Sequence, residues 1–148
     1  MLQRMRELAV QSSSETLANE ERSYIQDEFL QLQSEVARIA ATTEFNGISL
    51  SDGSVSSIDV QVGINNSTTS RIAISLIDLT TASLGINAID LSAASSAQSA
   101  LDTLDTALSS VNSGRSVLGA VQNRLNSALN NSQVYSEAMA SAESQIRD

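Results

Sequence analysis

The feature that most constrains the fold is an apolar stripe at helical spacing through the last third of the chain. The chain contains no proline, so nothing in residues 93–147 forbids one helix of roughly 80 Å at about 1.5 Å per residue. Gly114 and Gly119 each cost about 1 kcal/mol relative to alanine, and we expect close packing or a mild bend there. The stripe consists of Leu101, Leu104, Leu108, Val111, Leu118, Val121, Leu125, Leu129, Met139 and Ile146.

Two shorter helices are predicted before it. Residues 1–13 place apolar side chains three and four positions apart, and residues 19–42 do the same after a possible N-cap at Asn19. Steps of four and three along the second helix are typical of a coiled-coil seam. Its members are Ile25, Phe29, Leu32, Val36 and Ile39.

The middle of the chain changes period. Asn46-Gly47 predicts a turn. Within residues 50–77, apolar and polar residues alternate around Ile58, Val60 and Val62 and again around Ile72, Ile74 and Leu76, as in a β-hairpin with one apolar face. Residues 78–92 form an irregular crossing. We therefore predict a mainly α fold with a small β part: an elongated antiparallel bundle of two N-terminal helices and one long C-terminal helix, plus a β-hairpin.

Composition narrows the function. A net charge of −9 disfavours nucleic acid and anionic membranes as partners, and no apolar run reaches the ~20 residues that cross a bilayer. Cysteine and histidine are both absent, which removes the commonest metal ligands and the commonest general base. Asp102 with Asp105, or Glu20 with Glu21, could be considered catalytic carboxylate pairs, but each pair is explained more simply as part of an exposed helix surface. We expect no enzyme activity, no cofactor and no metal. We interpret Asn65-Asn66-Ser67-Thr68 as a polar loop rather than a glycosylation site.

Four segments resemble motifs of one known family. Residues 2–11, LQRMRELAVQ, resemble the LQRxRELAVQ segment of bacterial flagellin, and residues 43–47, TEFNG, resemble its TxFNG turn. Residues 119–125, GAVQNRL, and residues 144–148, SQIRD, resemble the GAVQNR run and the SxIRD ending. The four motifs occur in the family's order and span almost the whole chain.

This resemblance implies a structural subunit of the bacterial flagellar filament. It covers the rod-like core domain, 1–148, which we divide into 1–47 (N-terminal helices), 48–92 (hairpin and crossing) and 93–148 (long helix). The terminal tube-forming helices and a variable outer domain have no counterpart, and neither end carries a helix-stop signal, so we expect adjoining segments. Such a protein is exported through the flagellar channel, is extracellular, and polymerises with its own kind beneath a cap.

The resemblance also implies contact residues. In the family, the surface around the first motif meets adjacent subunits and is bound by the flagellin-sensing Toll-like receptor of vertebrate hosts. Carried over by motif, Arg4, Leu8 and Glu28 are the main candidates: the two charges for hydrogen bonds and Leu8 as an apolar anchor. Secondary candidates are Gln3, Arg6, Glu7, Val10, Gln11, Ile25 and Arg124. From residue type alone, Arg4 and Glu28 fit a solvated helix face, and Leu8 and Ile25 fit the core.

A different function class remains open. Hook–filament junction proteins share the helical scheme of flagellins, and a coiled-coil adaptor would show a similar seam. Filament assembly by the full-length chain would separate these alternatives.

Overall fold

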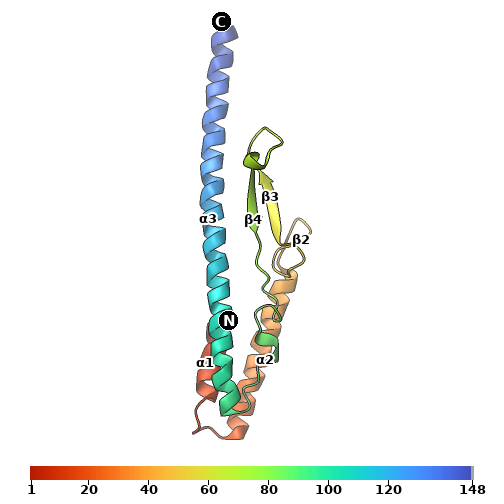
Figure 1. Cartoon of the computed structure of the whole chain (residues 1–148), viewed down its shortest axis with the longest axis vertical. Coiled ribbons are helices and arrows are strands. Elements are labelled where there is room, and N and C mark those ends of the chain that lie inside the picture. The colour runs from red at the N-terminus through yellow and green to blue at the C-terminus, as the bar shows by residue number, and fades with distance from the viewer. Residues whose placement is uncertain (148) are drawn as a thin grey trace. The chain divides into compact units, whose positions relative to one another are not determined.

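A computed structural model describes residues 1–147, and its three helices and two antiparallel hairpins confirm the predicted class (Figure 1). The helices are α1 (Leu2–Ser12), α2 (Asn19–Thr42) and α3 (Ala94–Arg147). The strands are β1 (Glu44–Phe45), β2 (Ile48–Ser49), β3 (Ser57–Gln61) and β4 (Arg71–Ser75), with short 3-10 turns η1 (Thr68–Ser70) and η2 (Ile86–Ala88). Asp148, the last residue of the fourth motif, lies outside the described residues. No helix among residues 1–147 combines the length and hydropathy needed to cross a membrane.

The chain divides into two compact units. Unit 1 comprises Met1–Ser56 and Leu76–Gly114, and unit 2 comprises Ser57–Ser75 and Arg115–Asp148. The helix α3 therefore contributes its first part to unit 1 and its second part to unit 2. Whether the chain acts as one domain, as the sequence suggests, stays a prediction.

Unit 1 holds a core built from three helices and the crossing segment. Its buried apolar residues, which include Phe29 and Leu104, come from α1, α2, the crossing segment and α3, and they form one cluster. The helix α1 runs antiparallel to both neighbours, because Arg4 meets Glu28 while Ser12 meets Arg22, and because Arg6 meets Asp105 while Ser12 meets Leu91. The three helices lie side by side at this part of the chain (Figure 1). The full cluster is Met5, Leu8, Ala9, Ile25, Phe29, Leu84, Ile86, Leu91, Ala97, Ala100, Leu104 and Ala107.

The seam of α2 is buried only in its first half. Ile25 and Phe29 lie in the core, Leu32 and Val36 are half-buried, and Ile39 is exposed. The predicted N-cap was wrong: Asn19 is the first helical residue, and Ala18, whose backbone is extended, precedes it. Alanine has no side-chain acceptor, so the junction is held instead by the Glu21 carboxylate, which accepts the Ala18 backbone N–H at 3.1 Å.

A tight turn follows α2 where it was expected. Asn46 and Gly47 both have positive φ, 51° and 76°, which is the requirement of a two-residue type I′ hairpin. The strands β1 and β2 pair on either side of it, with Phe45 opposite Ile48. The sequence predicted the turn but not this pair of two-residue strands.

Gly114 in α3 is a point of close packing. A Cβ atom there would lie 1.7 Å from Cδ1 of Ile77, which directly precedes the crossing segment, so only glycine lets that side chain reach the helix. The expectation of close contact is thus confirmed for Gly114. At Gly119 a Cβ atom would meet nothing within 4 Å, so close packing does not explain that glycine.

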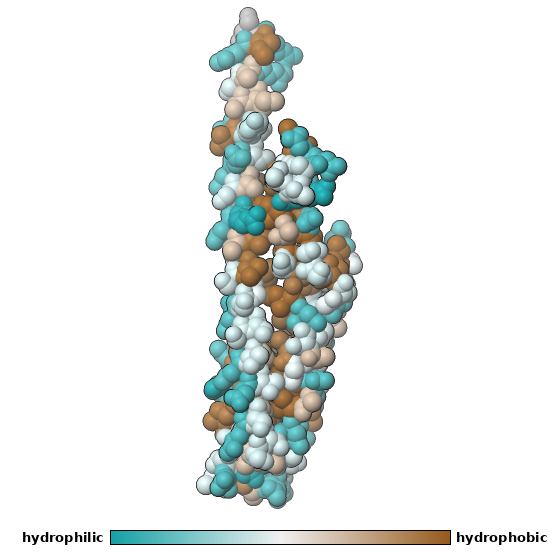
Figure 2. Space-filling view, in the orientation of Figure 1, coloured by the Kyte–Doolittle hydropathy of each residue, from teal (hydrophilic) through white to brown (hydrophobic). Residues whose placement is uncertain are grey.

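Unit 2 consists of the β3–β4 hairpin and the second part of α3. The pairs Ile58–Ile74 and Val60–Ile72 confirm the predicted apolar face, but Val62 and Leu76 fall just outside the strands. Ile72 on the hairpin and Val121 on α3 are buried. Along the last turns of α3, hydrophobic side chains remain on the surface (Figure 2), and the stripe residues Leu118, Leu129, Met139 and Ile146 are exposed.

Candidate contact surface on α1

The helix α1 has one face in the core and one face in solvent. Met5, Leu8, Ala9 and Ser12 are buried. Side chains three, four and seven positions apart share a face of a helix, so the other side of α1 collects a different set. These residues line a shallow depression and are called the α1 face from here on: Gln3, Arg6, Glu7, Val10 and Gln11.

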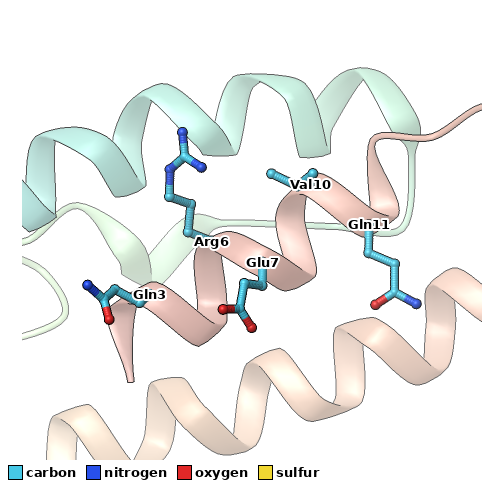
Figure 3. Close-up of a pocket in the computed structure, with 5 residues that line it drawn as sticks. All are labelled: Gln3, Arg6, Glu7, Val10 and Gln11. Atoms are coloured by element: carbon cyan, nitrogen blue, oxygen red, sulfur yellow. The ribbon is translucent and has the colours of Figure 1, made fainter.

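Figure 3 shows how the α1 face is framed. The helix α1 lies between α3 and α2, with Arg6 and Val10 leaning toward α3 and with Glu7 and Gln11 leaning toward α2. Val10 is 47% exposed, so the α1 face offers one apolar side chain among donors and acceptors. Backbone movement is limited because the opposite side of the helix is packed in the core.

An ion pair joins the α1 face to α3. The guanidinium of Arg6 donates from Nε to Oδ1 of Asp105 at 2.5 Å and from a terminal nitrogen to Oδ2 at 3.1 Å. This two-point geometry is the one that arginine favours with carboxylates. The hydrogen bond from Arg6 lowers the pKa of Asp105 below its usual value. Both side chains are about half exposed, so the pair adds little stability but fixes the orientation of Arg6.

A second pair joins α1 to α2 beside this face. Arg4 donates from Nε to Oε1 of Glu28 at 2.8 Å and from a terminal nitrogen to Oε2 of Glu7 at 3.2 Å. These hydrogen bonds raise the pKa of the Arg4 guanidinium. The structure therefore brings together Arg4 and Glu28, the two charged residues singled out from the sequence.

The other predicted contact residues are divided between core and surface. Leu8 is 1% exposed and Ile25 is nearly as buried, so their side chains pack the core and cannot offer a surface anchor without movement. Arg124 is exposed and belongs to unit 2. The remaining candidates are those that form the α1 face.

Sequence reasoning missed the buried arginine that fixes the corner between α1 and α2. Arg22 donates from Nε to the Ser12 carbonyl at 3.1 Å and from a terminal nitrogen to the Ser14 carbonyl at 2.7 Å. The last carbonyls of a helix lack partners within it, so a cation placed there is favourable. The signal was available, because Arg22 lies three residues before Ile25 and so continues the apolar seam.

Two glutamines of α2 were also missed. The Gln33 side-chain amide donates to the Ile86 carbonyl at 2.7 Å, and the Gln26 side-chain oxygen accepts the Leu91 backbone N–H at 2.7 Å. They satisfy polar backbone groups of the crossing segment where it packs against the core. Their spacing of seven residues, along one side of the seam, was the available sign.

The geometry suits binding to another protein surface. Arginine is enriched in protein interfaces, and here it stands beside a half-exposed valine on a helix whose position is fixed by the core and by two interhelical ion pairs. The α1 face is shallow, which fits a broad contact better than the enclosure of a small molecule.

Comparisons with known proteins agree with the resemblance seen in the sequence. Residues 1–56 match the family model of the bacterial flagellin N-terminal helical region, and residues 101–148 match that of the C-terminal helical region. A flagellin of Halalkalibacterium halodurans is 43% identical over the whole chain, which covers 54% of that relative. The flagellar filament 30.7 kDa core protein of Treponema maltophilum is 36% identical over the whole chain, which covers 56% of it.

A solved structure extends the likeness to the fold. The crystal structure of Bacillus cereus flagellin matches with a TM-score of 0.76 and 31% identity, over 88% of this chain and 74% of that one. The chain spans little more than half the length of the two relatives named above. Two family models in the expected order, full-length similarity and a shared fold agree with one another: the chain belongs to the bacterial flagellin family.

Proposed function

We propose that this chain is the core portion of a structural subunit of the bacterial flagellar filament, and that the α1 face meets a neighbouring subunit. The observation that carries the proposal is the fixed presentation of the α1 face, with a packed core behind it and ion pairs on both sides. A subunit that repeats the same contact many times gains from such a surface, because little conformational freedom is lost at each contact.

The place of action follows from this role. As a filament subunit, the protein acts outside the cell, on the bacterial flagellum, after export through the flagellar channel and assembly beneath the cap. Its principal partners are other copies of the same subunit. The alternative, a hook–filament junction protein, shares the helical scheme but does not form a long polymer by itself.

The direct test is assembly of a chimaera. Residues 1–148 replace the matching portion of the Halalkalibacterium halodurans flagellin, which supplies the rest of the subunit. The chimaera is then placed under filament-forming conditions and followed by sedimentation and electron microscopy. We expect long filaments. A folded chimaera that stays small would contradict the filament role and favour the junction or adaptor alternative.

A pair of variants tests the α1 face within that assay. Val10→Glu places a charge on the α1 face, whereas Leu30→Glu makes the same change at a residue of similar exposure, 41%, on the side of α2 away from Glu28. We expect Val10→Glu to reduce filament yield roughly tenfold or more and Leu30→Glu to leave it near the parental level. Equal loss in both variants would contradict a specific role of the α1 face.

We propose a second role for the same region, as a ligand of the flagellin-sensing Toll-like receptor of vertebrates. Support comes from the first motif, which is intact in α1, and from the neighbouring Arg4 and Glu28, which are about half exposed. The test measures receptor activation by the chimaera and by its Arg4→Ala and Leu30→Ala variants. Leu30 is exposed on the side of α2 away from Glu28 and serves as the control. We expect only Arg4→Ala to weaken activation, and unchanged activation would contradict this role.

A further inference from the structure

The turn between β1 and β2 contains the one asparagine of the chain that a glycine follows. Asn46 precedes Gly47, and every other asparagine precedes a residue with a side chain. Asparagine is chemically labile because the backbone nitrogen of the next residue can attack its side-chain carbonyl carbon, Cγ. Glycine makes this attack easiest, since it has no side chain to hinder the approach and the widest choice of backbone angles. The pair is therefore a candidate for spontaneous deamidation.

The reaction needs only water as a co-reactant. The Gly47 nitrogen loses its proton and forms a bond to Cγ of Asn46, while the bond from Cγ to the side-chain nitrogen breaks and ammonia leaves. Water then opens the resulting succinimide ring at either of its carbonyl carbons, which gives aspartate or isoaspartate. In isoaspartate the main chain runs through the side chain and so contains one extra carbon atom.

The structure leaves both reacting groups free. Asn46 and Gly47 are exposed, and within residues 1–147 no hydrogen bond joins the Asn46 side chain or the Gly47 N–H to another group. A Cβ atom added at Gly47 would meet nothing within 4 Å. The space around the attacking nitrogen is therefore open.

The turn has to open before the ring can form, because a closed type I′ turn holds the Asn46 backbone in a single conformation. Little opposes this opening. The hairpin stands beyond the end of α2 (Figure 1), each of its strands has two residues, and none of them is buried. Phe45 beside the turn is 73% exposed. Short hairpins with so little packing open at low cost in free energy.

A second acidic or amide residue before a glycine, Asp52 before Gly53, stands in a different setting. Aspartate can form the same ring, but Oδ1 of Asp52 accepts the Ser54 hydroxyl at 2.6 Å and the Ser54 N–H at 3.0 Å. These hydrogen bonds lower the pKa of Asp52, and an ionised carboxylate resists attack by a nucleophile. A Cβ atom at Gly53 would lie 2.7 Å from Oδ2 of Asp78, so this backbone is also crowded.

At other asparagines the attacking nitrogen is already bound. In the loop of the larger hairpin, the Ser67 N–H donates to the Asn65 carbonyl at 2.9 Å, and the side-chain oxygen of Asn66 accepts from Arg71 at 2.6 Å. Inside α3, the amide after each asparagine belongs to the hydrogen-bond ladder of the helix. These helical residues are Asn112, Asn123, Asn126, Asn130 and Asn131.

We propose that Asn46 is the residue at which this chain deamidates first, and that the exposed turn between β1 and β2 is what makes it so. The modification changes the turn permanently. The extra main-chain atom of isoaspartate does not fit the two-residue loop that a type I′ turn requires, and either product adds a negative charge beside Glu44. Nothing in this chemistry depends on the filament role.

Peptide mapping of residues 1–148 after incubation at mildly alkaline pH tests this proposal. Cleavage after arginine releases residues 39–71 as one peptide, which contains Asn46, Asp52 and Asn66. Mass spectrometry with fragmentation locates each deamidation, and enzymatic methylation detects isoaspartate. We expect Asn46 to react at least about tenfold faster than Asn66, which corresponds to about 1.4 kcal/mol in the barrier. Earlier conversion of Asn66 would overturn the proposal.

Two variants separate the effect of the turn from that of the dipeptide. Asp52→Asn creates a second asparagine–glycine pair whose side-chain oxygen can still accept from Ser54. We expect it to react at least about tenfold more slowly than Asn46 in the folded chain, and at the same rate in urea. Gly47→Ala strains the turn, where φ is 76°, yet we expect it to slow the reaction at Asn46 at least about tenfold.

Circular dichroism confirms that both variants fold like the parent before incubation. Equal rates for the two asparagine–glycine pairs of folded Asp52→Asn would overturn the proposal, because the dipeptide alone would then set the rate. An unchanged rate at Asn46 in Gly47→Ala would also overturn it, because the Gly47 nitrogen would not be the attacking group.

Discussion

The helix α3 passes through two different environments, and the contrast between them explains much of this molecule. In unit 1 it packs into a twelve-residue apolar core with α1, α2 and the crossing segment. Among the residues of unit 2 that the structure describes, only Ile72 and Val121 are buried apolar residues, and most of the helix surface is exposed. Yet unit 1 carries the whole net charge, and unit 2 carries none. Unit 1 therefore combines a packed apolar core with an excess of negative charge, whereas unit 2 leaves apolar side chains of α3 exposed.

Removing a large side chain from each environment should show this contrast most clearly. Phe29→Ala removes a fully buried ring from the core of unit 1, and we expect it to lower the free energy of unfolding by about 3–5 kcal/mol. Leu129→Ala truncates an exposed residue of unit 2 and should change that free energy by less than about 0.5 kcal/mol. Urea unfolding of both variants measures the difference. Similar losses would mean that Leu129 is packed as tightly as a core residue, which would contradict its exposure.

The buried arginine gives the next largest effect. Arg22→Met preserves an apolar stem but leaves the Ser12 and Ser14 carbonyls without their donor. We expect a loss of about 2–3 kcal/mol in the free energy of unfolding. Arg22→Lys keeps a charge near those carbonyls and should lose less. If chemical denaturation finds the methionine variant as stable as the parent, the corner between α1 and α2 is held by something other than Arg22.

The two glycines of α3 provide a matched pair within one helix. Gly119→Ala adds a methyl group in open space and should stabilise the chain by up to about 1 kcal/mol. Gly114→Ala gains the same helix propensity but drives a Cβ atom into Ile77, so overpacking of about 1–3 kcal/mol should cancel or exceed that gain. The midpoint of thermal unfolding should therefore rise in Gly119→Ala, and in Gly114→Ala it should stay unchanged or fall. Equal shifts would contradict the close contact between α3 and Ile77.

Acid should affect unit 1 through small individual contributions. Hydrogen bonds lower the pKa values of Glu35, Asp52, Asp78, Asp90 and Asp105, all of which lie in unit 1. A carboxyl group with a lower pKa in the folded state stabilises the fold above its unfolded pKa, about 4, and loses that contribution as the pH falls through the folded value.

The variant Asp105→Asn isolates one of these contributions. It loses the ion pair with Arg6, so its stability should depend less on pH than that of the parent between about pH 5 and pH 2. Denaturant titrations at a series of pH values measure this dependence. Asp102→Asn on the same helix is the control, and an identical pH dependence for Asp105→Asn and the parent would contradict the role assigned to the pair.

Hydrophobic spacing was enough to predict all three helices and the larger hairpin. Sequence periodicity reports which side chains share a face, and the bounds of α2 and α3 agree with the prediction to within one residue. Periodicity does not report what covers a face. For this reason the sequence predicted which apolar residues share one face of α3, but it did not predict that Leu104 is buried and Met139 is exposed.

The candidate site was predictable in part for the same reason. The motif in α1 identified the residues of the α1 face, and the family resemblance also brought forward Leu8 and Ile25, which the fold buries. A motif shows which residue stands at each position, but it does not show whether the fold buries that residue. The partners of Arg6 and Arg22 depend on how α1 docks against segments far along the chain, and no local pattern contains that information.

Hydrogen exchange along α3 tests the contrast between the two units most directly. We expect amides of residues 98–112 to exchange at the slow rate of the unit 1 core. Amides of residues 130–146 should exchange faster by at least about a hundredfold, because fewer packed side chains oppose their opening. The change should fall near Gly114, within a helix that has no break. Uniform protection from one end of α3 to the other would contradict the account.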